Sequence, residues 1–208
     1  MRSGLAVLGV AVALIIGAGC GIEAADEPEF TSLFDGKTLK GWVSQQTDRF
    51  FVKDGVLVND GGTGWLRSEK SFRDFEFRAE YRAIKPGSDS GIFFRASAES
   101  MGKEPHWPAR CYQLQIIDAE GNCMLFGHGL APPRFDRKAD VLRTADEDAK
   151  RWQKIRLRVV GSRAEVALND VVVTTSDAIQ VPEGHLGLQG KNGHFEWRAL
   201  KIRKFPGK

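Results

Sequence analysis

Short apolar segments with a period of two residues, separated by turn-forming residues, are the feature of this sequence that most restricts its fold. Apolar side chains at every second position are typical of a half-buried β-strand. Gly, Asp and Asn, which favour turns, lie between the segments. The segments are 50–52, 56–58, 65–67, 75–81, 91–95, 112–117, 152–160, 164–168, 171–174, 186–188 and 195–202. This pattern predicts an all-β domain, folded as a sandwich or a jelly roll.

Helical periodicity is weak throughout the sequence. The segment 136–151 is the only helix-like stretch, and its high charge predicts a short surface helix or a loop. Between two strand segments, Asn169-Asp170 suits a two-residue hairpin turn, because both residue types tolerate positive φ.

Composition and the N-terminal residues predict one exported domain. The chain of 208 residues is 42% hydrophobic, enough for one sizeable core, and nothing in it marks a second domain. Its first residues carry one positive charge and lead into an apolar run that ends near residue 19, shorter than the ~20 residues needed to cross a bilayer. This predicts a signal peptide over 1–19, a tether over 20–30 and a single domain over 31–208.

Cysteine positions bear on how the chain is exported. Small residues precede Cys20, an arrangement that resembles a bacterial lipoprotein box cleaved before Cys20, whose thiol is then lipidated. A cut after Ala24 is the alternative. We therefore expect a periplasmic or cell-envelope lipoprotein, attached to the membrane through Cys20, or a secreted protein. Cys111 and Cys123 then remain, either as a disulfide or as two buried thiols.

The charged residues argue against a nucleic-acid surface. The sequence has 30 Lys and Arg against 27 Asp and Glu, a formal net charge of +3. Basic and acidic residues alternate along 76–82 and form no patch of the kind that a phosphate backbone requires. No nucleic-acid partner is expected.

Two strand segments each carry polar side chains on one face. Ile92 and Phe94 face one side of the predicted sheet, and Arg95 faces the other. In the next segment, Gln113 and Gln115 share a face. A guanidinium and two carboxamides offer directional donors and acceptors without a large fixed field, which suits a neutral polyhydroxylated ligand such as a sugar.

A set of motifs spread along the chain resembles the 3-keto-disaccharide hydrolase family. The motifs are FDGKTLKGW at 34–42, GWL at 64–66, DFEF at 74–77, SGIFFR at 90–95, QIID at 115–118 and GHLGLQ at 184–189. The resemblance extends over about residues 30 to 204. It implies a concanavalin-like jelly-roll sandwich of two antiparallel sheets, found in exported bacterial proteins that act on, or bind, oxidised glycosides.

The resemblance also implies a chemistry that begins with a sugar oxidised to a ketone at C3. The ketone acidifies the hydrogen on C2, so a base removes it, the glycosidic oxygen on C1 leaves, and water adds across the alkene. Such a reaction needs one base with a pKa near ambient pH. It also needs hydrogen-bond donors or a divalent metal to hold the developing enolate oxygen.

Candidate residues for these roles follow from the resemblance and from the polar face. The base is sought among Asp118, His106 and His128. The substrate-binding candidates are Arg95, donating to the ketone or hydroxyls, Gln113 and Gln115, binding ring hydroxyls, and Trp107, stacking on a pyranose ring.

Structural roles are the alternatives for the same residues. Arg95 pairs with a carboxylate at the sheet edge, Asp118 forms a turn, and Trp107 anchors a loop. The two glutamines are solvated strand residues or hydrogen-bond to neighbouring strands. Many members of the similar family carry Glu at the position of Gln113, so the amide removes a potential base or metal ligand.

Two functions from different classes are consistent with this sequence. The first is an enzyme that cleaves 3-keto-glycosides or 3-keto-disaccharides by base-assisted elimination and hydration or by net hydrolysis. The alternative is a non-catalytic carbohydrate-binding module of the same fold. The four His residues have no HxxxH spacing, so a zinc site built by the protein is not expected, whereas a divalent metal cofactor stays open.

Overall fold

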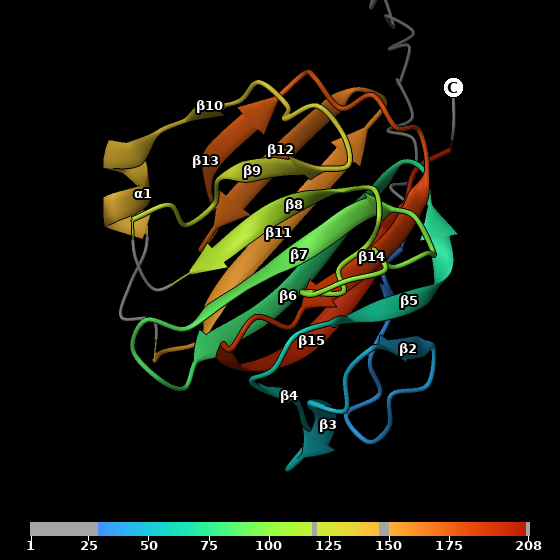
Figure 1. Cartoon of the computed structure of the whole chain (residues 1–208). Helices are drawn as coiled ribbons and strands as arrows, with labels where there is room; N and C mark the ends of the chain where they lie inside the picture. Colours follow the sequence, from blue (N-terminus) through green and yellow to red (C-terminus); the bar gives the residue numbers. More distant parts are fainter. Residues whose placement is uncertain (1–28, 118–119, 146–149, 207–208) are drawn as a thin grey trace, which may run out of the picture.

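Two antiparallel β-sheets packed face to face make up the domain, with one short helix at an edge (Figure 1). The structure, a computed structural model, describes residues 29–117, 120–145 and 150–206. The all-β prediction is therefore confirmed. We call the two layers the large sheet and the small sheet.

The large sheet has nine strands and the small sheet has six. The large sheet contains β1 (Thr31–Ser32), β3 (Phe50–Lys53), β4 (Val56–Asp60), β6 (Phe75–Ala83), β10 (Asp136–Arg137), β11 (Gln153–Val160), β12 (Arg163–Leu168), β13 (Val171–Ser176) and β15 (His194–Lys204). The small sheet runs in the order β2 (Trp42–Gln45), β5 (Trp65–Phe72), β14 (Gly184–Gln189), β7 (Asp89–Ala96), β8 (Cys111–Ile117) and β9 (Leu125–His128).

The hydrophobic core lies between the sheets, because every second side chain of each strand points inward. Phe77 and Leu157 come from the large sheet, and Ile92, Phe94 and Leu114 come from the small sheet. All five are at most 1% exposed. Burying a side chain of this size stabilises the fold by about 1.5 to 3 kcal/mol.

A second buried cluster lies on the opposite face of the small sheet, which we call the outer face. Trp65, Phe93, Ala96 and Cys111 form it, and Trp107 packs against it. Trp65 and Phe93 meet edge to face at 5.8 Å between ring centroids, a favourable aromatic geometry. This cluster is the apolar floor beside which the polar side chains of the outer face lie.

Several local predictions can be compared with the structure. Asn169 and Asp170 have φ of 47° and 68° and join β12 to β13 with Leu168 opposite Val171, so the hairpin turn is confirmed. The segment 136–151 contains the short helix α1 (Ala139–Ala145) after β10. The sequence pattern missed four short strands, β1 and β10 with two residues each and β2 and β9 with four. Strands this short contain few alternations, so the pattern finds some of them, such as β3, and misses others.

The two internal cysteines are buried thiols, and no disulfide joins Cys111 to Cys123. Burial raises the pKa of the Cys111 thiol far above its ordinary value, so this group is not a nucleophile at neutral pH. In the part of the chain that the structure describes, no helix has both the length and the apolar character needed to cross a membrane.

Candidate functional site

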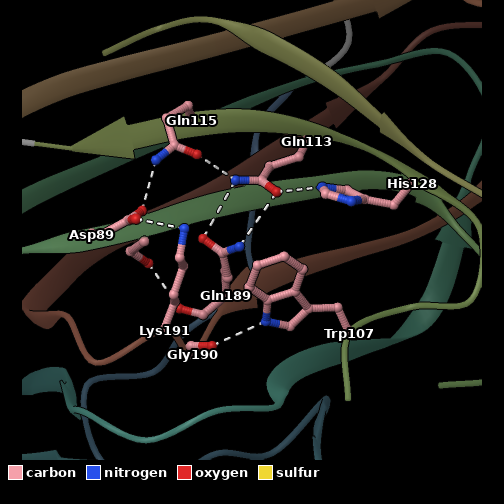
Figure 2. Close-up of polar contacts among 9 residues, drawn as sticks. Asp89, Trp107, Gln113, Gln115, His128, Gln189, Gly190 and Lys191 are labelled. Carbon is pink, nitrogen blue, oxygen red and sulfur yellow. Dashed lines mark hydrogen bonds and ion pairs between the residues drawn. The ribbon is translucent and has the colours of Figure 1, made fainter. Parts of the chain in front are cut away.

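Polar side chains from four strands of the small sheet converge on its outer face (Figure 2). Gln113 and Gln115 lie on β8, Gln189 on β14, His128 on β9 and Asp89 on β7. The three glutamines are 3%, 8% and 0% exposed. Buried carboxamides require hydrogen-bond partners, so the contacts among them decide what this group does.

The glutamines and His128 form one connected hydrogen-bond network that ends on a carboxylate. Gln115 Nε2 donates to Asp89 Oδ1 at 2.6 Å, and Gln113 Nε2 donates to Gln115 Oε1 at 2.5 Å. At the other end, His128 Nε2 lies 2.6 Å from Gln113 Oε1. The sequence prediction that Gln113 and Gln115 share a face, opposite Leu114, agrees with this placement.

Gln189 pairs with Gln113 through both ends of its carboxamide. Gln189 Nε2 donates to Gln113 Oε1 at 3.3 Å, and Gln113 Nε2 donates to Gln189 Oε1 at 3.4 Å. The backbone carbonyl of Gln189 accepts a hydrogen bond from Ser90 Oγ at 2.8 Å. These contacts link β14, β7 and β8 across the site.

A glycine in β7 makes room for the network. A Cβ added at Gly91 would lie 2.8 Å from Gln113 Nε2 and 3.0 Å from the carbonyl oxygen of Leu114. Real Cβ atoms do not approach so closely, so any larger residue at 91 would displace the Gln113 carboxamide. The glycine of the SGIFFR motif thus has a local steric reason.

Lys191 brings a positive charge to the site. Its Nζ lies 2.8 Å from Asp89 Oδ2 and 5.7 Å from the centre of the Trp107 ring. The Trp107 indole Nε1 donates to the carbonyl of Gly190 at 3.1 Å, which fixes the ring over the outer face (Figure 2). The Lys191 side chain is 46% exposed, so it remains accessible to a ligand.

His128 is half-buried among aromatic rings. Its ring lies edge to face with Phe93 at 6.1 Å and with Trp107 at 5.4 Å. Burial, with a smaller contribution from the charge of Lys191, lowers the pKa of His128 below its ordinary value of 6.5. The imidazole is therefore neutral at neutral pH, which is the form that accepts a proton.

Arg95 is not part of this group, contrary to the expected alternation of 90–95. Phe93 lies opposite Gly187 while Ala96 lies opposite His185, so β7 has one extra residue here, and Arg95 takes a φ of 52°. Such a bulge redirects the side chain, and Ala96 occupies the outer face instead.

The Arg95 guanidinium is buried in a structural ion pair. Its Nη2 lies 3.3 Å from Asp74 Oδ1, and its Nη1 donates to the carbonyl of Val181 at 2.9 Å. The side chain is 0% exposed. This is the alternative role, pairing with a carboxylate, and it leaves Arg95 without access to a ligand on the outer face.

The two other candidates for the base lie elsewhere. His106 has a φ of 59°, and its Nε2 lies 3.3 Å from Glu104 Oε1. It lines a surface pocket with Gln45 and Met101 and makes no contact with the glutamine network among the described residues. Asp118 lies outside the described residues. Of the two candidates that the structure describes, His128 contacts Gln113 and His106 does not.

Sequence patterns did not reveal Asp89, Gln189 and Lys191. A signal existed for Gln189, because Leu186 and Leu188 face the core and the next residue in an alternating strand must face outward. Asp89 begins β7 and Lys191 lies in the loop after β14, so alternation gives no direction for either side chain. Their role depends on the contact between these two segments, which are far apart in sequence.

The donors at this site do not fit a divalent cation. The described residues contain no group of three or more His, Cys, Asp or Glu side chains placed to hold a metal. Within the network, Asp89 is already paired with the cation of Lys191, and the carboxamide oxygens accept from neighbouring N–H groups. Among the residues that the structure describes, no set of carboxylate and carbonyl oxygens at this site is directed at one point, as Mg²⁺ or Ca²⁺ requires.

A family model described as the 3-keto-alpha-glucoside-1,2-lyase-like domain matches residues 29–203. The chain belongs to this family. The match spans nearly all of the described residues and both sheets, so the resemblance seen in the sequence motifs is confirmed.

Known relatives and structures agree with this family and fold. A 3-keto-disaccharide hydrolase of Bacteroides thetaiotaomicron is 32% identical over 84 residues, which is 34% of this chain and 29% of that protein. A candidate glycosyl hydrolase from Parabacteroides distasonis superposes with a TM-score of 0.63 at 18% identity, covering 85% of this chain and 100% of that one. The carbohydrate binding module CBM66 from Bacillus subtilis superposes with a TM-score of 0.62 at 12% identity, covering 79% of this chain and 96% of that one. The two structural likenesses establish the jelly-roll fold.

Proposed function

We propose that this protein cleaves the glycosidic bond of 3-keto-glycosides, with His128 as the base. The observation that carries the proposal is the placement of a neutral, half-buried imidazole beside the cation of Lys191 on a face floored by aromatic rings. A base of this kind suits removal of a carbon-bound proton next to a ketone. The family and the Bacteroides relative support the substrate class.

The reaction proceeds in two steps, an elimination and a hydration. His128 removes the C2 proton, and the electron pair of the C–H bond forms an enolate with the C3 ketone. The enolate collapses to a C1–C2 double bond, the glycosidic oxygen leaves C1, and imidazolium returns the proton to that oxygen. Water then adds across the double bond, with its hydroxyl on C1 and its proton on C2.

Lys191 takes the electrophilic role first expected of Arg95. Its ammonium is exposed on the same side of the site as the Trp107 ring, so it can approach a developing enolate oxygen. A positive charge fixed near that oxygen lowers the free energy of the enolate. Trp107 supplies an apolar surface for the C–H groups of the sugar ring.

Release of the aglycone from a chromogenic 3-keto-glucoside by the purified protein tests this proposal. The His128→Gln variant should lose release, because Gln cannot accept the proton. The His194→Gln variant is the matched control. His194 begins β15 and contacts Lys85, outside the glutamine network. Wild-type protein without turnover, or His128→Gln with full turnover, would overturn the proposal.

Glycan binding without catalysis is the second candidate function. The observation in its favour is that the three glutamines hydrogen-bond to one another, which makes a rigid polar surface beside the Trp107 ring. The fold shared with the Bacillus carbohydrate binding module is consistent with it. Calorimetric binding of an unoxidised glycan, with no release from the keto-glucoside, would select this function.

We also propose export, with cleavage before Cys20 and lipidation of its thiol. The support is the apolar run over 4–19 and the small residues ahead of Cys20. Mass analysis of the mature N-terminus separates the outcomes. A lipidated Cys20 supports the anchored form, a free N-terminus at Ala25 supports secretion, and an uncut Met1 contradicts both.

A further inference from the structure

Two consecutive carboxamides connect the carboxylate of Asp89 to His128 in single file (Figure 2). The links measure 2.6 Å from Asp89 to Gln115, 2.5 Å from Gln115 to Gln113 and 2.6 Å from Gln113 to His128. All three are short for hydrogen bonds with a nitrogen donor. The chain of contacts crosses three strands, β7, β8 and β9.

The carboxylate determines the direction of every hydrogen bond in this chain. An ionised carboxylate only accepts, so Gln115 must present its Nε2 to Asp89 and its Oε1 to Gln113. Gln113 must then present its Nε2 to Gln115 and its Oε1 to His128. His128 must therefore carry its proton on Nε2. The opposite direction would place an amide oxygen against the carboxylate, with no proton between them.

The pairing of Gln189 with Gln113 is compatible with the same direction and adds a third partner to Gln113. Gln189 donates to Gln113 Oε1 and accepts from Gln113 Nε2. A flipped Gln113 would place like ends together at Gln115, whose own orientation is set by Asp89. Gln113 is thus held by three partners and has no alternative orientation of equal energy.

We propose that Gln113 and Gln115 are positioning residues that fix His128 as its Nε2–H tautomer and so leave Nδ1 as the proton acceptor. The role of Nδ1 as a base rests on the proposed function, whereas the tautomer does not. Among the described residues His128 makes no hydrogen bond through Nδ1, so this atom is available to a substrate. A carboxylate would perform the same task through a direct contact, but it would also stabilise imidazolium and keep His128 protonated up to a higher pH, where it could not accept a proton.

The charged groups around His128 are consistent with a neutral ring. Lys191 lies on the loop after β14 and disfavours imidazolium. Asp89, at the start of β7, is separated from His128 by two carboxamides and is paired with Lys191. Cys111, opposite His128 on β8, is a protonated thiol. None of these groups offers His128 a direct negative charge.

Nitrogen-15 NMR of histidine-labelled protein tests the tautomer without substrate. The His128 signals, assigned by their loss in His128→Gln, should show a protonated Nε2 and an unprotonated Nδ1, with an Nε2 proton protected from exchange. In Gln113→Leu that protection should be lost. In Gln113→Glu the acid midpoint of the His128 titration should move to higher pH, a change that a merely structural role would not produce.

Kinetics of the same variants test the catalytic consequence. Gln113→Leu should lower kcat about 10- to 100-fold, as for other residues that orient a reacting group, with little change in KM. Gln45→Leu, a half-buried glutamine of β2 outside the network, is the control and should change neither quantity.

Wild-type His128 protonated on Nδ1, or a protected Nε2 proton that survives in Gln113→Leu, would overturn the inference. The expected tautomer together with no turnover would leave the positioning role intact and refute the proposed function instead.

Discussion

Some charged side chains of this protein stabilise the fold, and others remain available for function. Arg95 and Asp74 belong to the first group, because they form an ion pair whose side chains are 0% and 11% exposed. Asp74 also accepts the backbone N–H of Gly161 at 2.8 Å. Removing one partner of such a pair leaves a desolvated charge behind, which costs more than the pair itself contributes.

Replacing Arg95 with Met should therefore lower the free energy of unfolding by about 3 kcal/mol, because Asp74 keeps its charge without a cation. Turnover per folded molecule should not change. Urea unfolding and a turnover assay measure the two effects. Arg73→Met is the control, since Arg73 is 56% exposed and lies 3.9 Å from Glu183; it should shift stability by less than about 1 kcal/mol. A stable Arg95→Met protein that has lost turnover would restore Arg95 to the site.

His128 illustrates the second kind of residue, and it predicts a pH profile. Protonated imidazole cannot act as a base, so kcat/KM should rise with pH along an acid limb whose midpoint lies below 6.5, because burial and Lys191 lower this pKa. Lys191→Met should move that midpoint upward, since it removes the neighbouring cation. Lys85→Met, a change near His194, is the control. If the midpoint of the acid limb is the same in Lys191→Met as in wild type, the base is a group other than His128.

Within the strands, alternation explains the site up to the point where a strand becomes irregular. Gln113 and Gln115 could be placed from sequence because β8 is regular from Cys111 to Ile117. Arg95 could not, because the extra residue in β7 reverses the alternation just before it. His128 lies at the end of β9, a four-residue strand that the alternation pattern did not reveal. The partners Asp89 and Lys191 required the tertiary fold.

Gly187 in β14 has no room for a side chain. A Cβ at Gly187 would lie 2.3 Å from the Cε3 atom of the buried Trp65 ring, so Gly187→Ala should destabilise the protein by about 1 to 3 kcal/mol. Gly102→Ala is the matched control, because a Cβ there meets nothing within 4 Å. Urea unfolding of both variants measures the difference. Equal stability of the two variants would mean that the Trp65 ring does not lie so close to Gly187.

At the scale of the whole molecule, the chain passes repeatedly between the sheets. β4 belongs to the large sheet, β5 to the small one, β6 to the large one and β7 to the small one, and β14 and β15 divide in the same way. No continuous part of the chain therefore forms one sheet alone, and both sheets share the single core. Such a domain is expected to unfold in one cooperative step, so a charge buried in one sheet affects the stability of both.

Glu76 is a charge of this kind, on β6 of the large sheet. Its carboxylate is 1% exposed and lies 2.5 Å from Arg78 Nη2 and 3.1 Å from Arg203 Nη2. Burial alone would raise the pKa of Glu76, but the hydrogen bonds from Arg78 and Arg203 outweigh it and bring the pKa below the ordinary 4.5. Because the folded pKa lies below the unfolded one, the stabilisation is complete above about pH 4.5 and is lost as the pH falls through the folded pKa.

Glu76→Gln should accordingly lower the free energy of unfolding by about 3 kcal/mol at pH 7, where it leaves two guanidinium groups without their carboxylate. The difference from wild type should shrink as the pH falls below 4.5, because the wild-type carboxylate is then protonated as well. Urea unfolding at a series of pH values measures both quantities. Glu80→Gln is the control. The Glu80 side chain is 27% exposed and pairs with Arg198, so this change should lower the free energy of unfolding by less than about 1 kcal/mol. A Glu76→Gln deficit that stayed constant down to pH 3 would mean that the loss comes from altered packing and not from the charge.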